Sequence, residues 1–438
     1  MLKAGAAIAD ISPIRPMFLY GYPHVPRLST GVHDPLQAAA LYLGSGRTEL
    51  LVITLDILFI SKESSERCRA DLEAKTGIPA AQILISATHT HSGPVTADYL
   101  AFRSDPVVPK TDPVYLAHFE SQIVEAGITA WKKKAEAEMA AASVMIDGVG
   151  SNRLSPEGLA DREAGILAVR RKDTKELIAL NVVYSMHPTV LHEDTTLASG
   201  DFPAMAKQQM VKAFPGLVPL YHTGPSGNQS PRYSVKAQTF AEAERLGGLL
   251  AAPVIARVKA LSDADFDANP VLKAAACLMK LEPRTFRSLR EAKENLQAKV
   301  AHYEQLKKDG APHGPVRTAE CTVFGAEELV VLAKSQENGE LRAWQDKCAT
   351  IQLQAFRIGS VCLACMPGEV FVEYGLEIKK KAPLKTWVVS LANGELQGYI
   401  VTPEAEVEGG YEAQCGFFKA SNGARLVEEL LRLVERVA

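Results

Sequence analysis

The sequence predicts an α/β fold in which a mixed β-sheet core is flanked by helices. In the first half of the chain, short apolar runs alternate with longer segments of helical period, which is typical of sheets whose strands are joined through helices. The 438 residues, of which 47% are apolar and 23% charged, suit a globular protein with a sizeable core. We therefore expect one large catalytic domain over residues 1–438, with a more polar, helical excursion at about 263–347.

Strands are expected wherever a short, mostly apolar run is bounded by turn residues or charges. In chain order these runs are Leu50–Ile57, Gln82–Ala87, Ala142–Ile146, Ile166–Val169, Ile178–Tyr184, Lys273–Leu281, Thr350–Ile358, Val361–Cys365 and Thr386–Leu391. Helices are expected where apolar residues recur at a spacing of three or four. These segments are Ser61–Thr76, Pro113–Glu138, Pro203–Ala213, Ala237–Leu261, Ser288–Lys308, Glu369–Lys381 and Asn422–Val437. The 288–308 segment is rich in Glu, Lys, Arg and Gln, so we expect it to lie solvated on the surface.

Charge and cysteine content narrow the class of protein. The net charge of −3, from 48 basic and 51 acidic residues, gives no support for nucleic-acid binding or for a basic membrane-surface patch. No apolar run approaches the ~18 residues that span a bilayer, and the N-terminus lacks the features of a signal peptide. The seven cysteines have no disulfide-like spacing, which favours reduced thiols. We expect a cytoplasmic protein with no transmembrane segment and no nucleic-acid partner.

The most informative motif is Ala-Thr-His-Thr-His-Ser-Gly-Pro at residues 87–94, directly after the apolar run 83–85. In an extended backbone, His89 and His91 point to the same side. Ligand sites of α/β folds gather at the ends of strands. The pair therefore indicates a metal site or a proton-transfer site, with buried, hydrogen-bonded histidines as the alternative.

The sequence contains two other catalytic motifs in part, and each lacks one required residue. His192-Glu193 does not extend to the His-Glu-x-x-His of zinc proteases, because Thr196 stands at the second histidine position. The segment 224–228 lacks the last glycine of the Gly-x-Ser-x-Gly nucleophile elbow. We expect residues 192–194 to form a solvated loop.

Four further segments are unusual for packing alone. They are Gly150–Arg153, Ser185–Thr189, Gly227–Arg232, and Met366–Glu369 together with Gly398–Pro403 and Tyr411. Together with the histidine motif, with Ala4–Pro13 and with Ser199–Pro203, they resemble the neutral/alkaline, non-lysosomal ceramidases, zinc amidases that cleave the amide bond of ceramide. The resemblance extends over most of the chain.

The resemblance implies one catalytic zinc ion per chain, bound by His89, His187, Glu369 and Tyr399. It implies cleavage of an N-acyl amide, from a small-molecule or lipid substrate, by zinc-bound hydroxide. His91 would carry a proton to the leaving amine, and Arg153 and Tyr411 would face the scissile carbonyl. Ser230 would lie close to the metal-bound water. Alternatives from packing alone are a helix-terminal position for Glu369, a surface cation for Arg153 and a simple turn residue for Ser230.

The sequence departs from the family pattern next to the serine. The ceramidases typically have Gly-Asp-Val-Ser-Pro-Asn, whereas this chain has Asn228 in place of the acid and Arg232 after the proline. We also expect no C-terminal β-sandwich domain, because the chain ends soon after Val437. Three alternatives therefore stay open. They are a zinc hydrolase of a small polar lactam, ester or sugar derivative, a non-catalytic binding protein, and a metal-free serine hydrolase that uses Ser230.

Overall fold

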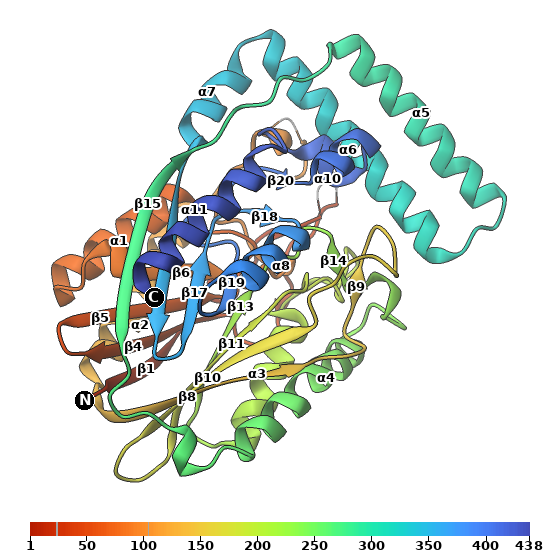
Figure 1. Ribbon diagram of the computed structural model, residues 1–438. Helices are drawn as coiled ribbons and strands as arrows, with labels where there is room; N and C mark the ends of the chain where they lie inside the picture. The colour runs from red at the N-terminus through yellow and green to blue at the C-terminus, as the bar shows by residue number, and fades with distance from the viewer. Residues whose placement is uncertain (23–24, 104) are drawn as a thin grey trace.

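The computed structural model describes residues 1–22, 25–103 and 105–438. Its largest element is a mixed sheet with the strand order β13-β11-β10-β8-β1-β4-β5-β6 (Figure 1). The strands of this large sheet are β1 (Lys3–Asp10), β4 (Gln37–Ser45), β5 (Thr48–Leu55), β6 (Ile83–Ala87), β8 (Ala135–Met145), β10 (Glu163–Arg171), β11 (Leu177–Tyr184) and β13 (Val218–Thr223). Parallel pairs join β5 to β6 and β11 to β13. The predicted fold class, a mixed sheet flanked by helices, is confirmed.

A second, smaller sheet packs on one face of the first. Its order is β15-β16-β17-β19, with the bounds β15 (Leu272–Lys280), β16 (Thr350–Ile358), β17 (Val361–Cys365) and β19 (Lys385–Val389). Apolar side chains from both sheets form one core between them, in which Trp387 is 1% exposed and Phe356 is fully buried. Gly165 of β10 lies against the Trp387 ring, where a Cβ atom would approach within 2.3 Å.

Helices cover the two outer faces, so the molecule has the layers helix, sheet, sheet, helix. The helices are α1 (Lys62–Thr76), α2 (Pro113–Lys132), α3 (Asp201–Ala213), α4 (Phe240–Lys259), α5 (Leu289–Lys308), α6 (His313–Glu337), α7 (Glu340–Cys348), α8 (Val372–Lys381), α9 (Pro403–Glu408), α10 (Tyr411–Cys415) and α11 (Asn422–Val437). Separate cores join α1 and α2 to one half of the large sheet and α3 and α4 to the other half. A further core joins α8 and α11 to the small sheet.

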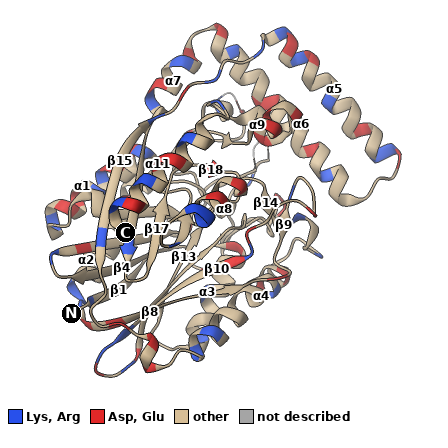
Figure 2. Ribbon diagram, in the orientation of Figure 1, with Lys and Arg blue, Asp and Glu red and all other residues tan. Residues whose placement is uncertain are grey.

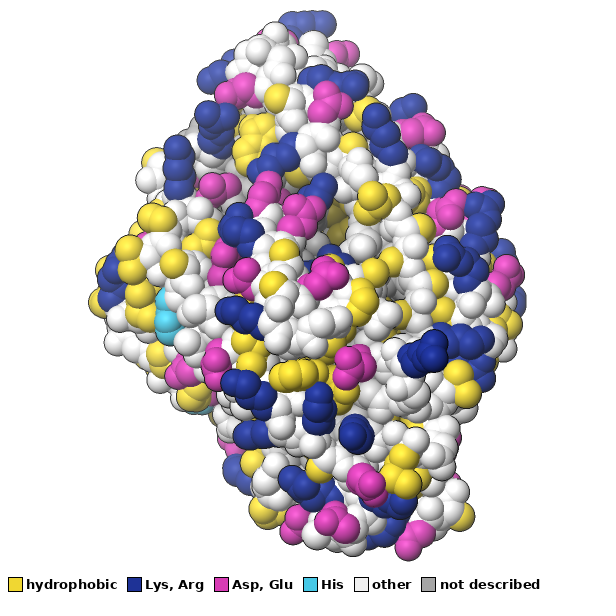
Figure 3. All heavy atoms as spheres, turned by 90° about the vertical axis from the view of Figure 1, so that its left-hand side faces the viewer, with side chains coloured by type: hydrophobic (Ala, Val, Ile, Leu, Met, Phe, Trp, Pro, Cys, Tyr) yellow, Lys and Arg dark blue, Asp and Glu magenta, His cyan; other side chains and the backbone are white. Residues whose placement is uncertain are grey.

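The polar excursion is a group of three helices, α5, α6 and α7, inserted between β15 and β16. The predicted solvated helix is confirmed, because only Ala292 of α5 is buried and charged residues line its ribbon (Figure 2). On the face shown in Figure 3, basic and acidic side chains are interspersed. Within the part of the chain that the structure describes, no helix combines the length and apolar character needed to cross a bilayer.

The sequence prediction differs from the structure at several places, and it also missed the strands β4 and β13. Residues 135–138 were expected to extend a helix but belong to β8, since pairing with β10 and β1 overrides the helix propensity of this Ala- and Glu-rich stretch. Strand β1, Lys-Ala-Gly-Ala-Ala-Ile-Ala-Asp, was missed because alanine and glycine carry little strand signal. Glu369 was expected at a helix start, but it lies in a short strand and α8 begins at Val372. All seven cysteines are free, and Cys362 and Cys365 are buried in β17.

A buried ion pair fastens α3 to the large sheet. Lys207 Nζ lies 2.6 Å from Asp56 Oδ2, with side chains 6% and 1% exposed. Replacing Lys207 by Met leaves an uncompensated buried carboxylate, and we expect this to lower the free energy of unfolding by about 3–5 kcal/mol. Urea unfolding measures the change. The matched control is Lys212→Met, an exposed position on the same helix, and a loss there equal to that of Lys207→Met would contradict the ion-pair account.

Candidate metal centre and pocket

The two histidines of the predicted metal site follow strands of the large sheet. His89 comes two residues after β6, and His187 comes three residues after β11. His89 has φ 71°, a left-handed conformation that is costly for a residue other than glycine and is found mainly at functional sites. The extended backbone under which His89 and His91 would point to the same side is therefore not present at His89. The His89 and His91 rings still lie side by side, with centroids 5.1 Å apart.

The segment 199–201 fixes both histidine loops. Thr90 Oγ1 donates to the Ser199 carbonyl at 2.6 Å, which holds the residue between the two histidines of the motif. The Asp201 carboxylate, at the start of α3, accepts from the backbone N–H groups of Val190 at 3.0 Å and Leu191 at 2.9 Å. The short motif at 199–201 thus positions the loops that carry His89 and His187.

Three electron-pair donors converge at one buried point. His89 Nε2 lies 3.2 Å from His187 Nε2 and 3.2 Å from Glu369 Oε2, and His187 Nε2 lies 3.0 Å from the same carboxylate oxygen. Nδ1 of His89 is 2.9 Å from the Leu58 carbonyl, and Nδ1 of His187 is 2.7 Å from the Ser226 carbonyl. Because a carbonyl only accepts, each Nδ1 carries the proton and each neutral ring turns a lone pair toward Glu369.

This arrangement fits a bound cation. Lone pairs that face a carboxylate in a buried site repel one another unless a positive charge lies between them. Ligands about 2.0–2.1 Å from a tetrahedral zinc ion stand about 3.3–3.4 Å apart, close to the three separations found here. Burial and the charge of Arg153 lower the pKa of His187 to about 4.

Tyr399 lies beside Glu369 on a neighbouring strand. The short strands β18 (Glu369–Val370) and β20 (Tyr399–Ile400) pair in parallel, with Glu369 opposite Tyr399. Burial and the charge of Glu369 raise the pKa of the Tyr399 phenol well above its ordinary value. A cation bound at this point would favour the phenolate and so make Tyr399 a candidate ligand.

Arg153 is buried and does not act as a surface cation. Its side chain is 7% exposed and Nε donates to Glu412 Oε1 at 2.6 Å. The guanidinium lies 5.4 Å from the Tyr399 ring centroid and 5.9 Å from that of Tyr411. Its buried Nη2 has no hydrogen-bond partner among the residues described. The structure therefore groups Arg153, Tyr399 and Tyr411, and the Nη2 group of the guanidinium is left for a ligand.

His91 and Ser230 occupy the same region. Nδ1 of His91 is 3.0 Å from the Gly21 carbonyl, and its buried Nε2 has no partner among the described residues. One ring nitrogen from each of His89, His91 and His187 lies within 4.8 Å of the other two. Ser230 Oγ accepts from the Arg232 backbone N–H at 3.3 Å, so Ser230 is both a turn residue and a wall of the pocket.

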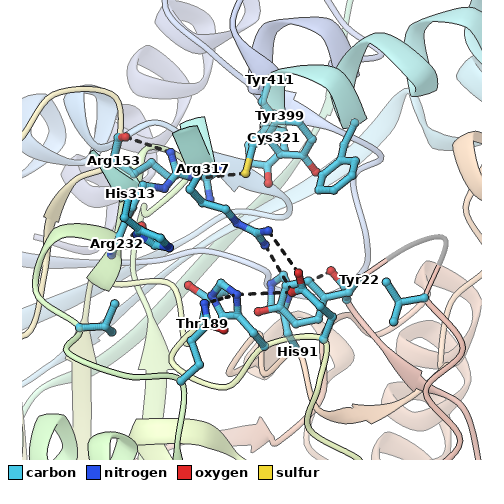
Figure 4. A pocket seen from close by; sticks show the side chains of 18 residues that line it. Tyr22, His91, Arg153, Thr189, Arg232, His313, Arg317, Cys321, Tyr399 and Tyr411 are labelled. Atoms are coloured by element: carbon cyan, nitrogen blue, oxygen red, sulfur yellow. Dashed lines mark hydrogen bonds and ion pairs between the residues drawn. The ribbon is translucent and has the colours of Figure 1, made fainter. Parts of the chain in front are cut away.

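A cavity of about 110 Å³ opens beside these residues (Figure 4). His91, Arg153, Ser230, Tyr399 and Tyr411 line it, while His89, His187 and Glu369 are not among its lining residues. Helix α6 supplies one wall through His313, Arg317, Cys321 and Phe324, which recur at helical spacing. The sequence analysis predicted a helical excursion over this region but missed the wall, because no local pattern shows that α6 packs against the pocket.

The expectation of a solvated loop at 192–194 is wrong at its first residue. The His192 side chain is 12% exposed, lines the cavity and is bonded through Nδ1 to Gln238 Nε2 at 2.8 Å. Its ring lies next to the Tyr22 ring at a tilt of 36°, with centroids 5.4 Å apart. The loop between β11 and α3 thus carries both His187 and part of the pocket wall.

Comparisons with known proteins show similarity in fold. No family model matches the sequence, and no curated protein matches it. A solved structure described as ceramidase complexed with C2 is similar with a TM-score of 0.74 and 16% identity, covering 99% of this chain and 74% of that chain. The neutral ceramidase of Pseudomonas aeruginosa is similar with a TM-score of 0.72 and 18% identity, over 99% and 75% of the two chains. The resemblance to neutral ceramidases is confirmed for the fold.

The metal content of purified protein tests the three converging donors. We expect about one zinc ion per chain after reconstitution, and less than about a tenth of that in His89→Ala or His187→Ala, because each loses one of few protein ligands. Elemental analysis after desalting gives the ratio. The control is His302→Ala, an exposed histidine that should bind zinc like the wild type. Full zinc occupancy in both site variants would contradict the assignment.

Proposed function

We propose that this protein is a zinc-dependent hydrolase that cleaves an amide (N-acyl) bond, as a ceramidase does. The observation that carries the proposal is the convergence of His89 Nε2, His187 Nε2 and Glu369 Oε2 at 3.0–3.2 Å. The similarity in fold to ceramidase structures supports the choice of reaction. Fold alone does not assign chemistry, so the proposal rests on the site.

In this proposal His89, His187, Glu369 and Tyr399 bind one zinc ion. Zinc so bound lowers the pKa of a coordinated water to about 7 and supplies a nucleophile at neutral pH. The imidazoles are held for this role by their Nδ1 bonds to the Leu58 and Ser226 carbonyls, which fix both the tautomer and the ring orientation.

Arg153 and Tyr411 would receive the negative charge that develops on the amide oxygen. The ion pair with Glu412 and the two aromatic rings hold the guanidinium in place, and Nη2 is the donor that has no partner among the described residues. Fixed donors of this kind contribute about 3–4 kcal/mol each to transition-state stabilisation. The buried Nε2 of His91 has no partner among the described residues, and it is the atom that would carry a proton to the leaving amine.

Asn228 does not mark a lost catalytic acid. Its Nδ2 donates to both Glu373 carboxylate oxygens, at 3.1 and 2.9 Å, and its Oδ1 accepts from the Val372 backbone N–H at 2.9 Å. An aspartate here would face Glu373 with like charge. The asparagine therefore joins the serine loop to the start of α8, which weakens the argument for a non-catalytic binding protein.

The lining of the cavity is mixed. Charged and polar side chains such as Arg232 and Arg317 stand beside apolar and aromatic ones such as Val235 and Phe324. Both a lipid amide and a small polar amide therefore stay candidates within the same zinc-hydrolase reaction.

Replacing His91 by Gln tests whether this residue carries a proton or binds zinc. If His91 carries a proton and does not bind zinc, we expect full zinc occupancy and a loss of about 10²–10⁴-fold in kcat for a chromogenic N-acyl amide. His302→Gln is the control. Loss of zinc in His91→Gln would place His91 among the ligands, and unchanged kcat would remove it from the mechanism.

The same assay in the presence of a chelator distinguishes the zinc mechanism from a metal-free mechanism with a serine nucleophile. The zinc proposal expects turnover to stop in the chelator and to return when zinc is added back. Turnover that persists in the chelator and is abolished by Ser230→Ala would contradict the zinc mechanism and support a serine nucleophile.

A further inference from the structure

We propose that the substrate carries an anionic group, of the carboxylate, sulfonate or phosphate type, and that Arg232 binds this group in the pocket. The inference rests on the proposed amide hydrolysis and names the substrate class for the same site. It starts from the position where this sequence has an arginine after the Ser230-Pro231 turn.

Arg232 is the pocket arginine that has no carboxylate partner among the described residues. Arg153 pairs with Glu412 at 2.6 Å. Arg317 pairs with Glu193 at 3.2 Å and with Glu320 at 2.7 Å. Among the described residues, the side chain of Arg232 contacts only neutral groups (Figure 4). A partly buried cation in a pocket without a counter-ion attracts a ligand of opposite charge.

Three hydrogen bonds hold the guanidinium of Arg232, and one edge of it has no partner among the described residues. Nη1 donates to the Arg153 carbonyl at 3.1 Å and to Thr318 Oγ1 at 3.0 Å, and Nη2 donates to Cys321 Sγ at 3.4 Å. A guanidinium has five N–H donors, so Nε–H and one Nη2–H have no partner among the described residues. Two donors in a fork match the two oxygens of a carboxylate, or two oxygens of a sulfonate or phosphate.

The bonds that orient Arg232 also place it next to the reacting groups. The carbonyl that it contacts belongs to Arg153, the residue proposed to face the scissile amide. Its own backbone N–H donates to Ser230 Oγ at 3.3 Å. Arg232 lines the same cavity as Arg153 and His91, so an anion held by Arg232 lies in the same pocket as the amide. The inferred substrate is a small N-acyl compound with an acidic group near the amide.

The test compares charged and neutral amides on the zinc-loaded protein. The probes are N-acetyl amino acids with one to four methylene groups between amide and carboxylate, N-acetylated aminosulfonic and aminoalkyl phosphate analogues, and the corresponding neutral methylamides. For the best acid, we expect Arg232→Asn to lower kcat/KM by about 10-fold to 100-fold, with a change under about 3-fold for its neutral methylamide. Arg232→Lys keeps the charge but loses the fork, and we expect an intermediate value.

Arg290→Asn is the matched control, because Arg290 is an exposed arginine of α5 far from this loop in the sequence. Wild-type kcat/KM that is equal for acids and methylamides would overturn the inference, as would an equal loss for both in Arg232→Asn, which indicates a structural role. The preferred acid among carboxylates, sulfonates and phosphates identifies the anion.

A binding measurement separates this inference from the proposed reaction. If no amide is hydrolysed, the proposed function fails, but calorimetric titration of zinc-free protein with the same acids still tests Arg232. We expect binding of the acid that weakens by about 10-fold or more in Arg232→Asn and stays unchanged in Arg290→Asn. No binding by the wild type, or equal binding by Arg232→Asn, would overturn the anion site.

Discussion

The candidate site depends on one constraint, which is that His89 Nε2, His187 Nε2 and a Glu369 carboxylate oxygen meet at one buried point, at 3.0–3.2 Å. Backbone carbonyls hold the Nδ1 atoms of both rings and so orient Nε2 toward Glu369. A cation bound between these three atoms would stabilise the cluster. The proposed zinc chemistry rests on this arrangement, with Arg153, Tyr399 and His91 around it.

The fold brings these donors together from two sheets. His89 and His187 follow β6 and β11 of the large sheet, whereas Glu369 follows β17 of the small one. The distance between the two sheets therefore sets the distance between imidazoles and carboxylate, and the core around Trp387 fixes that spacing. On the open side, α6 closes the pocket with His313, Arg317 and Cys321. The helical excursion thus shapes the substrate space without contributing to the metal donors.

The local sequence predicts those parts of the site that directly follow strongly apolar strands. The strands before His89 and His187 were recognisable, and so the ends of those strands could be identified as a candidate site. Glu369 and Tyr399 were identified through family resemblance alone, because their pairing on β18 and β20 is a long-range contact that no local pattern contains. Arg317 and His313 were not predicted for the same reason, because only the packing of α6 over the pocket brings them to the site. The Ala- and Gly-rich β1 became a strand through pairing with β4 and β8.

Zinc-edge X-ray absorption of the zinc-loaded protein tests the central claim most directly, because it measures the ligands around the metal itself. The account predicts about four nitrogen and oxygen ligands near 2.0–2.1 Å, with the scattering of two imidazole rings. Sulfur ligands at about 2.3 Å, or a six-coordinate shell of oxygen without imidazole, would contradict it, since neither matches a centre built from His89, His187 and Glu369.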